Sequence, residues 1–365
     1  MGWSGPGATA PSGCSSDRRT AWVLHGERRC YSPLMLDVCL IGAGRIGRVH
    51  AQNLTAHPRA RVRWVIDRLE SSARSLAEAV GAQWSLNPGD GLADPQVRAV
   101  WIASPTWTHV DMIRAAARAG KPIFCEKPIA LDLDRYDEAM AEVEAADVPL
   151  FVGFNRRFDP SFRRVKAELA TGSVGKLELV QIVSRDPSPP PVEYLEHSGG
   201  LFRDMMIHDL DMASWLLGDE PVEVYAAGSA LVDAQIGRLG DVDTALVTLR
   251  TAEGVLCQIS NSRRATYGYD QRLEVLGSKG MLRAENVQPD TVSRWTEDGG
   301  QLPRLLDFFV ERYAAAYRAE LDHFVRAVED PSQPLLTGPA DGRRALRLAD
   351  AAAESLESGQ PVRPG

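Results

Sequence analysis

Apolar runs of strand length alternate with amphipathic segments over the first half of the chain. The apolar runs occupy residues 36–41, 61–66, 97–104, 121–125 and 148–154. Between them, apolar positions repeat at helical spacing over residues 45–57, 72–82, 112–120 and 133–146. Strands that alternate with helices through short connections predict a parallel, doubly wound sheet of the Rossmann type.

The second half of the chain has a different pattern, in which short strands follow one another. Strand-like runs occupy residues 176–184, 222–232, 244–250, 254–262, 272–278, 281–285 and 291–295. Several are joined by turns that contain glycine, which is typical of an antiparallel sheet. Helical spacing predicts further helices over residues 201–217, 308–330 and 342–358, the first of them without a break.

These two patterns predict an α/β fold with an N-terminal Rossmann domain and a C-terminal α+β domain. The length agrees, because 365 residues are too many for one ordinary core. We place the dinucleotide-binding domain at 35–155 and the substrate-binding and oligomerisation domain at 156–365, with the terminal helix leaning back on the first domain. Residues 1–34, rich in Gly, Ser, Pro and Arg, predict a disordered leader or a start assigned too early.

Charge and cysteine content narrow the class of protein. The net charge of -8 argues against a protein that neutralises nucleic-acid phosphates. The five cysteines are spaced irregularly, which fits neither a disulfide framework nor a zinc site and favours a reducing, cytoplasmic compartment. No apolar run approaches the ~20 residues that cross a bilayer, so we expect no membrane partner.

A glycine-rich motif follows the first predicted strand and opens the first predicted helix. Gly42, Gly44 and Gly47 stand in the order G-x-G-x-x-G. Such glycines make a tight turn, let the backbone approach a pyrophosphate, and let helix and strand pack closely. The phosphates are expected on the free amides at the positive end of the helix.

Asp67 ends the second strand, twenty residues after Gly47, where a carboxylate would accept hydrogen bonds from the adenosine ribose. It would also repel a 2'-phosphate, so the sequence favours NAD over NADP, although Arg68 beside it can soften that preference. Since ligands bind beyond the carboxyl ends of parallel strands, the later strand ends are expected to converge on the same crevice. The predicted cofactor-binding residues are Gly42, Gly44, Arg45, Ile46, Gly47, Asp67, Arg68, Ser104, Thr106, His109, Glu126 and Lys127.

The stretch "GGLFRDMMIHDLDMASWLLG", at 199–218, places ionisable groups in an apolar helix. Asp204 and His208 are four residues apart, which on one helix puts them on the same face. Alone, such a pair is usually an exposed contact of small energetic value. A metal site at His208, Asp209 and Asp211 is disfavoured, because no other histidine has suitable spacing, and we expect no metal.

Taken together, these motifs resemble the glucose-fructose oxidoreductase/inositol dehydrogenase (Gfo/Idh/MocA) family. The resemblance runs from residue 36 to the C-terminus. It rests on "GAGRIGRVHAQNL", Asp67, "SPTWTHV", "CEKPIA", "GFNRRFDPSF" and "SGGLFRDMMIHDLDMA", and is strongest to the myo-inositol 2-dehydrogenase branch. It implies that Lys127, Asp204 and His208 are catalytic. It also implies an open, mostly antiparallel second sheet, one face of which meets another subunit of a homodimer or homotetramer.

Oxidation of a secondary alcohol by NAD needs a base near the hydroxyl and a positive group that stabilises the developing alkoxide. His208 is the favoured base, because imidazole accepts a proton near neutral pH. Lys127 would then hold the reacting oxygen, and a Lys127 made neutral by burial is the alternative base. Asp204 would orient the imidazole or bond a substrate hydroxyl directly.

The predicted substrate-binding residues are Asn155, Arg157 and Tyr269, besides the catalytic three. By resemblance Arg157 is the favoured contact of the two neighbouring arginines. The proline-stiffened loop "SRDPSPPP" (184–191) is expected to line the pocket. Tyr267, Tyr269, Asp270 and Arg272 stand at a strand entrance, within expected reach of the substrate or of a second subunit.

The predicted function is NAD-dependent oxidation of a cyclic polyol, most specifically of myo-inositol to its 2-keto form, scyllo-inosose. Within the same chemistry, another inositol isomer or a sugar is the alternative substrate. A redox-neutral cleavage of glycosides by bound NAD is a further alternative, although the motifs look less like that branch. A non-catalytic NAD sensor is the alternative from another class, and the presence of Lys127, Asp204 and His208 together argues against it.

Overall fold

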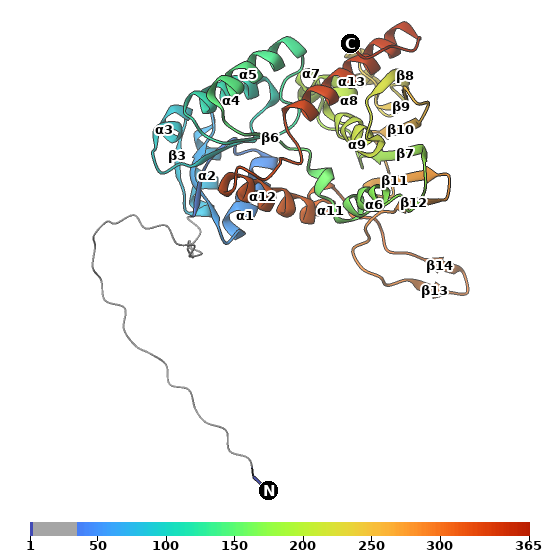
Figure 1. Cartoon of the computed structure of the whole chain (residues 1–365), viewed down its shortest axis with the longest axis horizontal. Helices are drawn as coiled ribbons and strands as arrows, with labels where there is room; N and C mark the ends of the chain where they lie inside the picture. Colours follow the sequence, from blue (N-terminus) through green and yellow to red (C-terminus); the bar gives the residue numbers. More distant parts are fainter. Residues whose placement is uncertain (3–34) are drawn as a thin grey trace. The chain divides into compact units, whose positions relative to one another are not determined.

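A six-stranded parallel sheet forms the first half of the chain (Figure 1). The structure, a computed structural model, describes residues 1–2 and 35–365, so almost all of the predicted leader lies outside the described residues. The strands, in the spatial order β3-β2-β1-β4-β5-β6, are β1 (Leu36–Ile41), β2 (Ala60–Ile66), β3 (Gln83–Ser85), β4 (Ala99–Ile102), β5 (Ile123–Cys125) and β6 (Leu150–Val152). This order confirms the predicted doubly wound sheet.

The first sheet is buried between helices, which is why its strands are apolar without interruption. All residues of β1, β4, β5 and β6 are buried, and the ring of Trp101 stacks on Phe124 at 3.7 Å. The segments that join the strands are α1 (Arg45–Ala56), α2 (Glu70–Val80), α3 (Pro88–Ala93), η1 (Thr106–Thr108), α4 (His109–Arg118) and α5 (Leu133–Ala146). The short β3 and α3 were not predicted, because three or six residues give little periodic signal.

The second half forms a mixed, mostly antiparallel sheet, which confirms the predicted fold class. Its strands, in the spatial order β12-β11-β7-β10-β9-β8, are β7 (Leu177–Arg185), β8 (Pro221–Ser229), β9 (Thr244–Thr251), β10 (Leu256–Ser262), β11 (Asp270–Gly277) and β12 (Gly280–Ala284). Only β7 and β10 run parallel to each other. The remaining segments are η2 (Asn155–Phe158), α6 (Pro160–Ala170), α7 (Val192–Ser198), α8 (Gly200–Asp204), α9 (Ile207–Leu217), α10 (Ala234–Arg238), α11 (Phe309–Arg312), α12 (Ala314–Glu329) and α13 (Pro339–Ser358).

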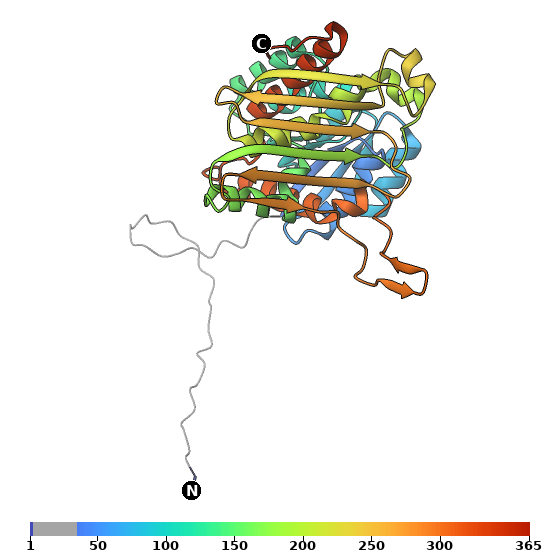
Figure 2. The same cartoon turned by 90° about the vertical axis from the view of Figure 1, so that its right-hand side faces the viewer.

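One face of the second sheet is covered and the other is open (Figure 2). Helix α9 packs on β7 and β10, and α13 packs on β8 and α9. Along β9, the buried Ala245, Val247 and Leu249 alternate with the exposed Leu246 and Thr248. This period of two is that of a strand with one face in the core. Helix α13 also contacts α5 and β6 of the first half.

Two predicted elements differ in the structure. Residues 291–295, predicted as a strand of the sheet, instead lead into β13 (Arg294–Thr296), which pairs with β14 (Gly299–Gln301) in a separate hairpin that projects from the body (Figures 1 and 2). The helix predicted over 308–330 is divided at Tyr313 into α11 and α12. Among the described residues, no helix is long and apolar enough to span a membrane.

Candidate active site

The glycine-rich loop between β1 and α1 has no room for a side chain at Gly42 or Gly47. A Cβ on Gly47 would lie 2.0 Å from the carbonyl oxygen of Gly42. A Cβ on Gly42, whose φ is +107°, would lie 2.4 Å from the carbonyl oxygen of Ala103. Gly44, the N-cap of α1, faces open space instead, and no side chain caps the helix there. The loop therefore offers free backbone amides to an anion, as the pyrophosphate of a dinucleotide requires.

Asp67 lies against this loop at the end of β2. Its carboxylate accepts a hydrogen bond from the backbone N–H of Ala43 at 2.7 Å and another from Leu69 at 2.9 Å. Arg68 is exposed beside it. The carboxylate is thus held at the edge of the loop, which fits contact with the ribose of a dinucleotide.

His109 and Ser104 belong to the connection after β4, and the structure gives His109 a structural partner on each side. The ring is buried, with Nδ1 at 2.8 Å from the carbonyl oxygen of Pro128 and Nε2 at 2.8 Å from that of Ser104. It therefore joins the segments that follow β4 and β5. Ser104 and Thr106 are partly accessible, and the Ser104 hydroxyl lies 2.6 Å from that of Thr108.

Glu126 faces away from its neighbour Lys127, into the interior. Its carboxylate lies 2.7 Å from Nε2 of His50, a buried residue of α1. Tyr317 of α12 packs edge-on against the His50 ring at 5.6 Å. Glu320, one turn along α12, is fully buried, and neither of its carboxyl oxygens has a hydrogen-bond partner in the described part of the chain. Burial, with the charge of Glu126 as a second cause, raises the pKa of Glu320 well above its usual value.

We expect Glu320→Gln to stabilise the protein increasingly as the pH rises above about 4.3, the ordinary glutamate pKa. Between that pH and its raised pKa, folded Glu320 holds a proton that the unfolded chain releases, so folding loses about 1.4 kcal/mol per pH unit. Glutamine has no such proton and escapes the loss. Thermal melts of both proteins across a pH series measure the difference, and a difference in Tm that does not change with pH would contradict the raised pKa.

Lys127 and Asp204 meet where the first sheet faces α8. The Lys127 ammonium donates a hydrogen bond of 2.7 Å to the backbone carbonyl of Asp204 and lies 3.7 Å from its carboxylate oxygen Oδ1. The same oxygen accepts a hydrogen bond of 2.8 Å from the Tyr194 hydroxyl. The other oxygen faces the buried guanidinium of Arg263 at 3.3 Å. Asp204 thus lies between two positive charges.

The predicted continuous helix over 201–217 is wrong, since it is interrupted after Asp204. In an unbroken helix the N–H of His208 would bond the carbonyl of Asp204. That carbonyl accepts from Lys127 instead, and the N–H of His208 turns to the carbonyl of Met205 at 3.4 Å. The N–H of Met206 bonds the carbonyl of Leu201, five residues back. The sequence between Asp204 and His208 holds no helix breaker, so the local pattern does not mark the interruption.

His208 is the second residue of α9 and interacts electrostatically with Lys127 and Arg156. Its ring lies 6.3 Å from that of Phe154, and its Nδ1 is buried without a hydrogen-bond partner among the described residues. Burial, with the charges of Lys127 and Arg156, lowers the pKa of His208 well below its usual value. The imidazole is therefore neutral near pH 7 and free to accept a proton.

Three further side chains interact with Asp204: Tyr194, Arg263 and Asp186. None of them is an individually predicted site residue, although Asp186 lies in the loop 184–191 that is expected to line the pocket. Asp186 directly follows β7, retains some exposure, and interacts electrostatically with Arg263 and Asp204. Burial raises its pKa to about 6, against the lowering effect of Arg263. Asp186 lies two residues after the predicted strand 176–184, so its position near a strand end was visible in the sequence. Nothing in the local pattern marks Arg263 or Tyr194.

The structure does not bring Arg157 into this group. Its guanidinium donates to Asp211 at 2.6 and 2.9 Å, to the carbonyl of Leu336 at 3.0 Å and to Asp341 at 2.9 Å. These contacts engage all three guanidinium nitrogens, so Arg157 ties η2 to α9 and α13. Its neighbour Arg156 pairs with Asp209 and interacts electrostatically with His208.

The other predicted substrate residues are either buried or bonded to one another outside the group around Asp204. Asn155 is buried in η2. Tyr269 is buried and interacts electrostatically with Arg156 and Asp186, which places it beside the group around Asp204. Tyr267, Asp270 and Arg272 bond one another: Asp270 accepts from the Tyr267 hydroxyl at 2.7 Å and from Arg272 at 2.7 and 2.9 Å.

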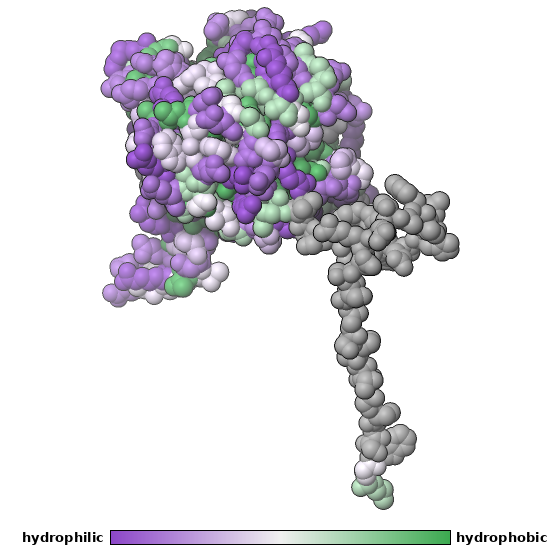
Figure 3. All heavy atoms as spheres, turned by 90° about the vertical axis from the view of Figure 1, so that its left-hand side faces the viewer, coloured by the Kyte–Doolittle hydropathy of each residue, from purple (hydrophilic) through white to green (hydrophobic). Residues whose placement is uncertain are grey.

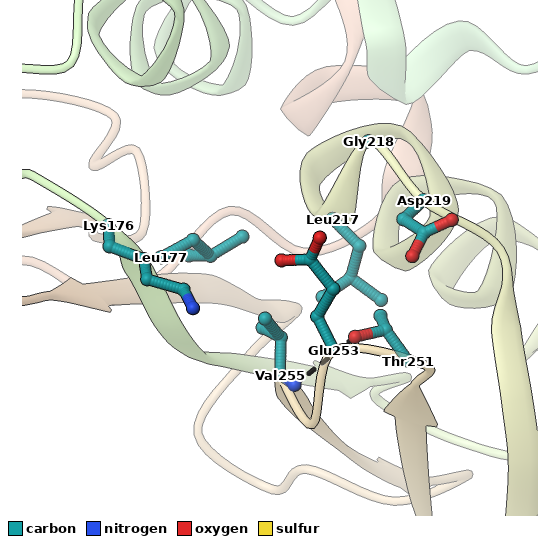
Figure 4. Close-up of a pocket in the computed structure, with 8 residues that line it drawn as sticks. All are labelled: Lys176, Leu177, Leu217, Gly218, Asp219, Thr251, Glu253 and Val255. Atoms are coloured by element: carbon teal, nitrogen blue, oxygen red, sulfur yellow. Dashed lines mark hydrogen bonds between the residues drawn. The ribbon is translucent and has the colours of Figure 1, made fainter.

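A shallow pocket elsewhere on the second half involves none of these residues (Figure 4). It lies at the opposite end of α9 from His208 and at the opposite end of β7 from Asp186. Its lining residues are Lys176, Leu177, Leu217, Gly218, Asp219, Thr251, Glu253 and Val255. Within the described chain, no group of three or more His, Cys, Asp or Glu side chains is arranged to hold a metal ion.

Two family models match the chain, one for each half. The model described as "Oxidoreductase family, NAD-binding Rossmann fold" matches residues 36–154. The model described as "GFO/IDH/MocA C-terminal domain" matches residues 162–283. The two matches together span most of the chain.

Individual relatives agree with these matches. The inositol 2-dehydrogenase of Rhizobium meliloti is 49% identical over 318 residues, which are 87% of this chain and 96% of the relative. The myo-inositol 2-dehydrogenase of Thermotoga maritima is 46% identical over 90% of this chain and 98% of its own. Among solved structures, a putative myo-inositol dehydrogenase from Sinorhizobium meliloti superposes with a TM-score of 0.88 at 46% identity, over 91% of this chain and 100% of that one.

Proposed function

The chain belongs to the GFO/IDH/MocA family of NAD-binding oxidoreductases, and from that membership we propose that it oxidises myo-inositol to scyllo-inosose. Family membership confirms the resemblance expected from the motifs, and the NAD-binding Rossmann fold confirms the expected cofactor. The observation that carries the substrate is the identity of 49% and 46% to two inositol 2-dehydrogenases over nearly their whole length.

In our proposal, different residues of the chain have different roles in the reaction. The glycine loop would hold the pyrophosphate of NAD, and Asp67 its adenosine ribose. When bound, NAD accepts the hydride from the ring carbon. Lys127 donates a hydrogen bond to the reacting oxygen and stabilises the charge that develops on it. His208 takes the hydroxyl proton, which its lowered pKa and unpartnered Nδ1 support.

In this proposal Asp204 positions Lys127 and also binds a substrate hydroxyl. Its backbone carbonyl fixes the Lys127 ammonium at 2.7 Å, and its carboxylate is held by Tyr194 and Arg263. Among the described residues no hydrogen bond joins Asp204 to His208, which favours a contact between Asp204 and a substrate hydroxyl over an orienting bond to the imidazole. Asp186 interacts electrostatically with Asp204 and Arg263, and Tyr269 interacts with Asp186.

The test of the proposed function is reduction of NAD followed by nicotinamide absorbance with myo-inositol, scyllo-inositol, chiro-inositol, glucose and xylose. We expect the highest kcat/KM with myo-inositol. A clear preference for another polyol would replace the substrate within the same chemistry. Binding of NAD without turnover on any of them would favour the sensor or the redox-neutral glycoside reaction.

We expect Asp67→Asn to reduce the preference for NAD over NADP about tenfold. The amide still accepts from the loop, but it no longer repels the 2'-phosphate, and the exposed Arg68 is free to approach that group. One lost charged hydrogen bond costs about 1.5–3 kcal/mol, which is a tenfold effect or more. The ratio of kcat/KM for the two cofactors measures the change, and a ratio equal to that of the wild type would exclude Asp67 from cofactor choice.

Assembly and location are part of the same proposal. We place the domain boundary near residue 155, between the two sheets. The open face of the second sheet carries the exposed Leu246, Leu256 and Leu276, which supports a homodimer or homotetramer built through that face. The three cysteines in the described chain, Cys39, Cys125 and Cys257, are buried free thiols, in keeping with a reducing cytoplasm.

A further inference from the structure

The hairpin of β13 and β14 projects away from the body of the described chain (Figures 1 and 2), and large apolar side chains on it are exposed. Every residue from 287 to 302 is exposed, with Val292 at 74%, Trp295 at 76% and Leu302 at 70%. Figure 3 shows the same projection as a largely hydrophilic surface that carries hydrophobic atoms. A lone two-stranded hairpin is marginally stable in water. Both features indicate a segment built to lie on another surface.

The root of the hairpin adjoins the open face of the second sheet. The hairpin segment starts three residues after β12, the edge strand of that sheet. Leu276 and Met281 are exposed on β11 and β12, and Val287 is exposed at the root. An apolar strip therefore runs from the edge of the sheet into the hairpin. A second copy seated on the open face would lie directly beside it.

The residues that leave the hairpin run back to the candidate active site. Leu305 packs on Gly268, where a Cβ would lie 2.6 Å from the Leu305 Cβ. The carbonyl of Leu306 accepts from the N–H of Tyr269 at 3.0 Å. Phe308 lies under the Arg45 guanidinium at 5.4 Å and meets the Tyr269 ring edge-on at 6.1 Å. One short segment thus connects the hairpin, the glycine-rich loop and the substrate side.

We propose that the hairpin, residues 287–302, docks on a second copy of this chain and thereby holds Phe308 over Arg45, so that assembly tightens NAD binding. The inference rests on the open-face contact proposed above. Docking fixes the segment that carries Phe308, and a cofactor that binds the assembled protein no longer has to order it. Because the hairpin stands at the rim of the open face, a second copy is the occupant that the geometry favours over the chain's own leader.

The test is a triple variant of the full-length chain, Val292→Ser, Trp295→Ser and Leu302→Ser, with Leu231→Ser as the matched control. Leu231 is an equally exposed leucine, at 69%, outside the hairpin and the site. Light scattering over a dilution series gives the mass, and calorimetry gives the Kd of NAD without any polyol. We expect the triple variant to dissociate at higher concentration and to bind NAD roughly fivefold more weakly or worse. The control should match the wild type.

Two further measurements test the proposal even if the triple variant misfolds. A benzoylphenylalanine at position 295 should form a covalent dimer on irradiation, and one at position 231 should not. Phe308→Leu should weaken NAD binding while the mass is unchanged. Docking on a second copy would be overturned by a wild-type mass in the folded triple variant or by a monomeric wild type. It would also be overturned if deletion of residues 1–34 caused the same loss of assembly and of NAD affinity. Wild-type NAD affinity in a dissociated variant would overturn the coupling. None of these outcomes depends on the polyol, so the proposed reaction stands or falls separately.

Discussion

Lys127→Ala is expected to lower kcat about 10³-fold while the Kd of NAD changes little. The ammonium lies beside Asp204, at the carboxyl edge of the first sheet, where a reacting hydroxyl would have to sit to face the cofactor. Loss of a charged donor that stabilises a developing oxyanion costs about 10²–10³ in rate, and loss of its help in proton transfer adds to this. The glycine loop and Asp67, which would bind the dinucleotide, do not contact Lys127.

The measurement pairs steady-state kinetics with NAD calorimetry on the same preparation. Lys176→Ala is the matched control, because Lys176 lines the pocket at the far end of β7 and should keep wild-type kcat. Lys127→Ala also leaves the carbonyl of Asp204 without its partner, so a melt should accompany the assay. Turnover at the wild-type rate in folded Lys127→Ala would remove Lys127 from the reaction.

The first half of the fold was open to prediction because each of its signals is local. An apolar strand, three glycines and an acidic strand end lie within 32 residues, and the steric demand at Gly42 and Gly47 is a property of that short segment. The uninterrupted apolar runs of the strands then follow from burial of the sheet on both faces. The same holds for Asp67, whose position depends only on the end of β2 and on the adjacent loop.

The second half was harder to predict from the sequence, because its decisive contacts join residues that are far apart along the chain. At the interruption after Asp204, Lys127, 77 residues earlier, donates to the carbonyl that a continuous helix would use. Arg263 reaches Asp204 from the end of another strand, 59 residues later. Arg157 and its neighbour Arg156 have the same local pattern, and only their partners distinguish them: Arg157 pairs with Asp211 and Asp341, and Arg156 with Asp209.

His208→Gln is expected to lower kcat by 10²–10⁴, the usual contribution of a positioned proton acceptor, with NAD binding retained. Glutamine is polar and of similar reach, but it has no basic nitrogen. If Lys127 is the base instead, the loss should be small and kcat should keep its dependence on pH. The two candidate bases are therefore separated by His208→Gln.

The pH dependence of the rate distinguishes the titration of His208 from that of Asp186. A base works only when unprotonated, so the rate falls as the pH drops through its pKa, and for His208 that fall belongs well below pH 6.5 because its pKa is lowered. Asp186, with a pKa of about 6, would add an earlier fall if its carboxylate must be ionised to bind substrate hydroxyls. Asp186→Asn should therefore remove the fall of kcat/KM near pH 6 and leave the lower one. A fall that persists at pH 6 in Asp186→Asn would assign it to another group, and its loss in His208→Gln would show that the histidine titrates there despite its burial.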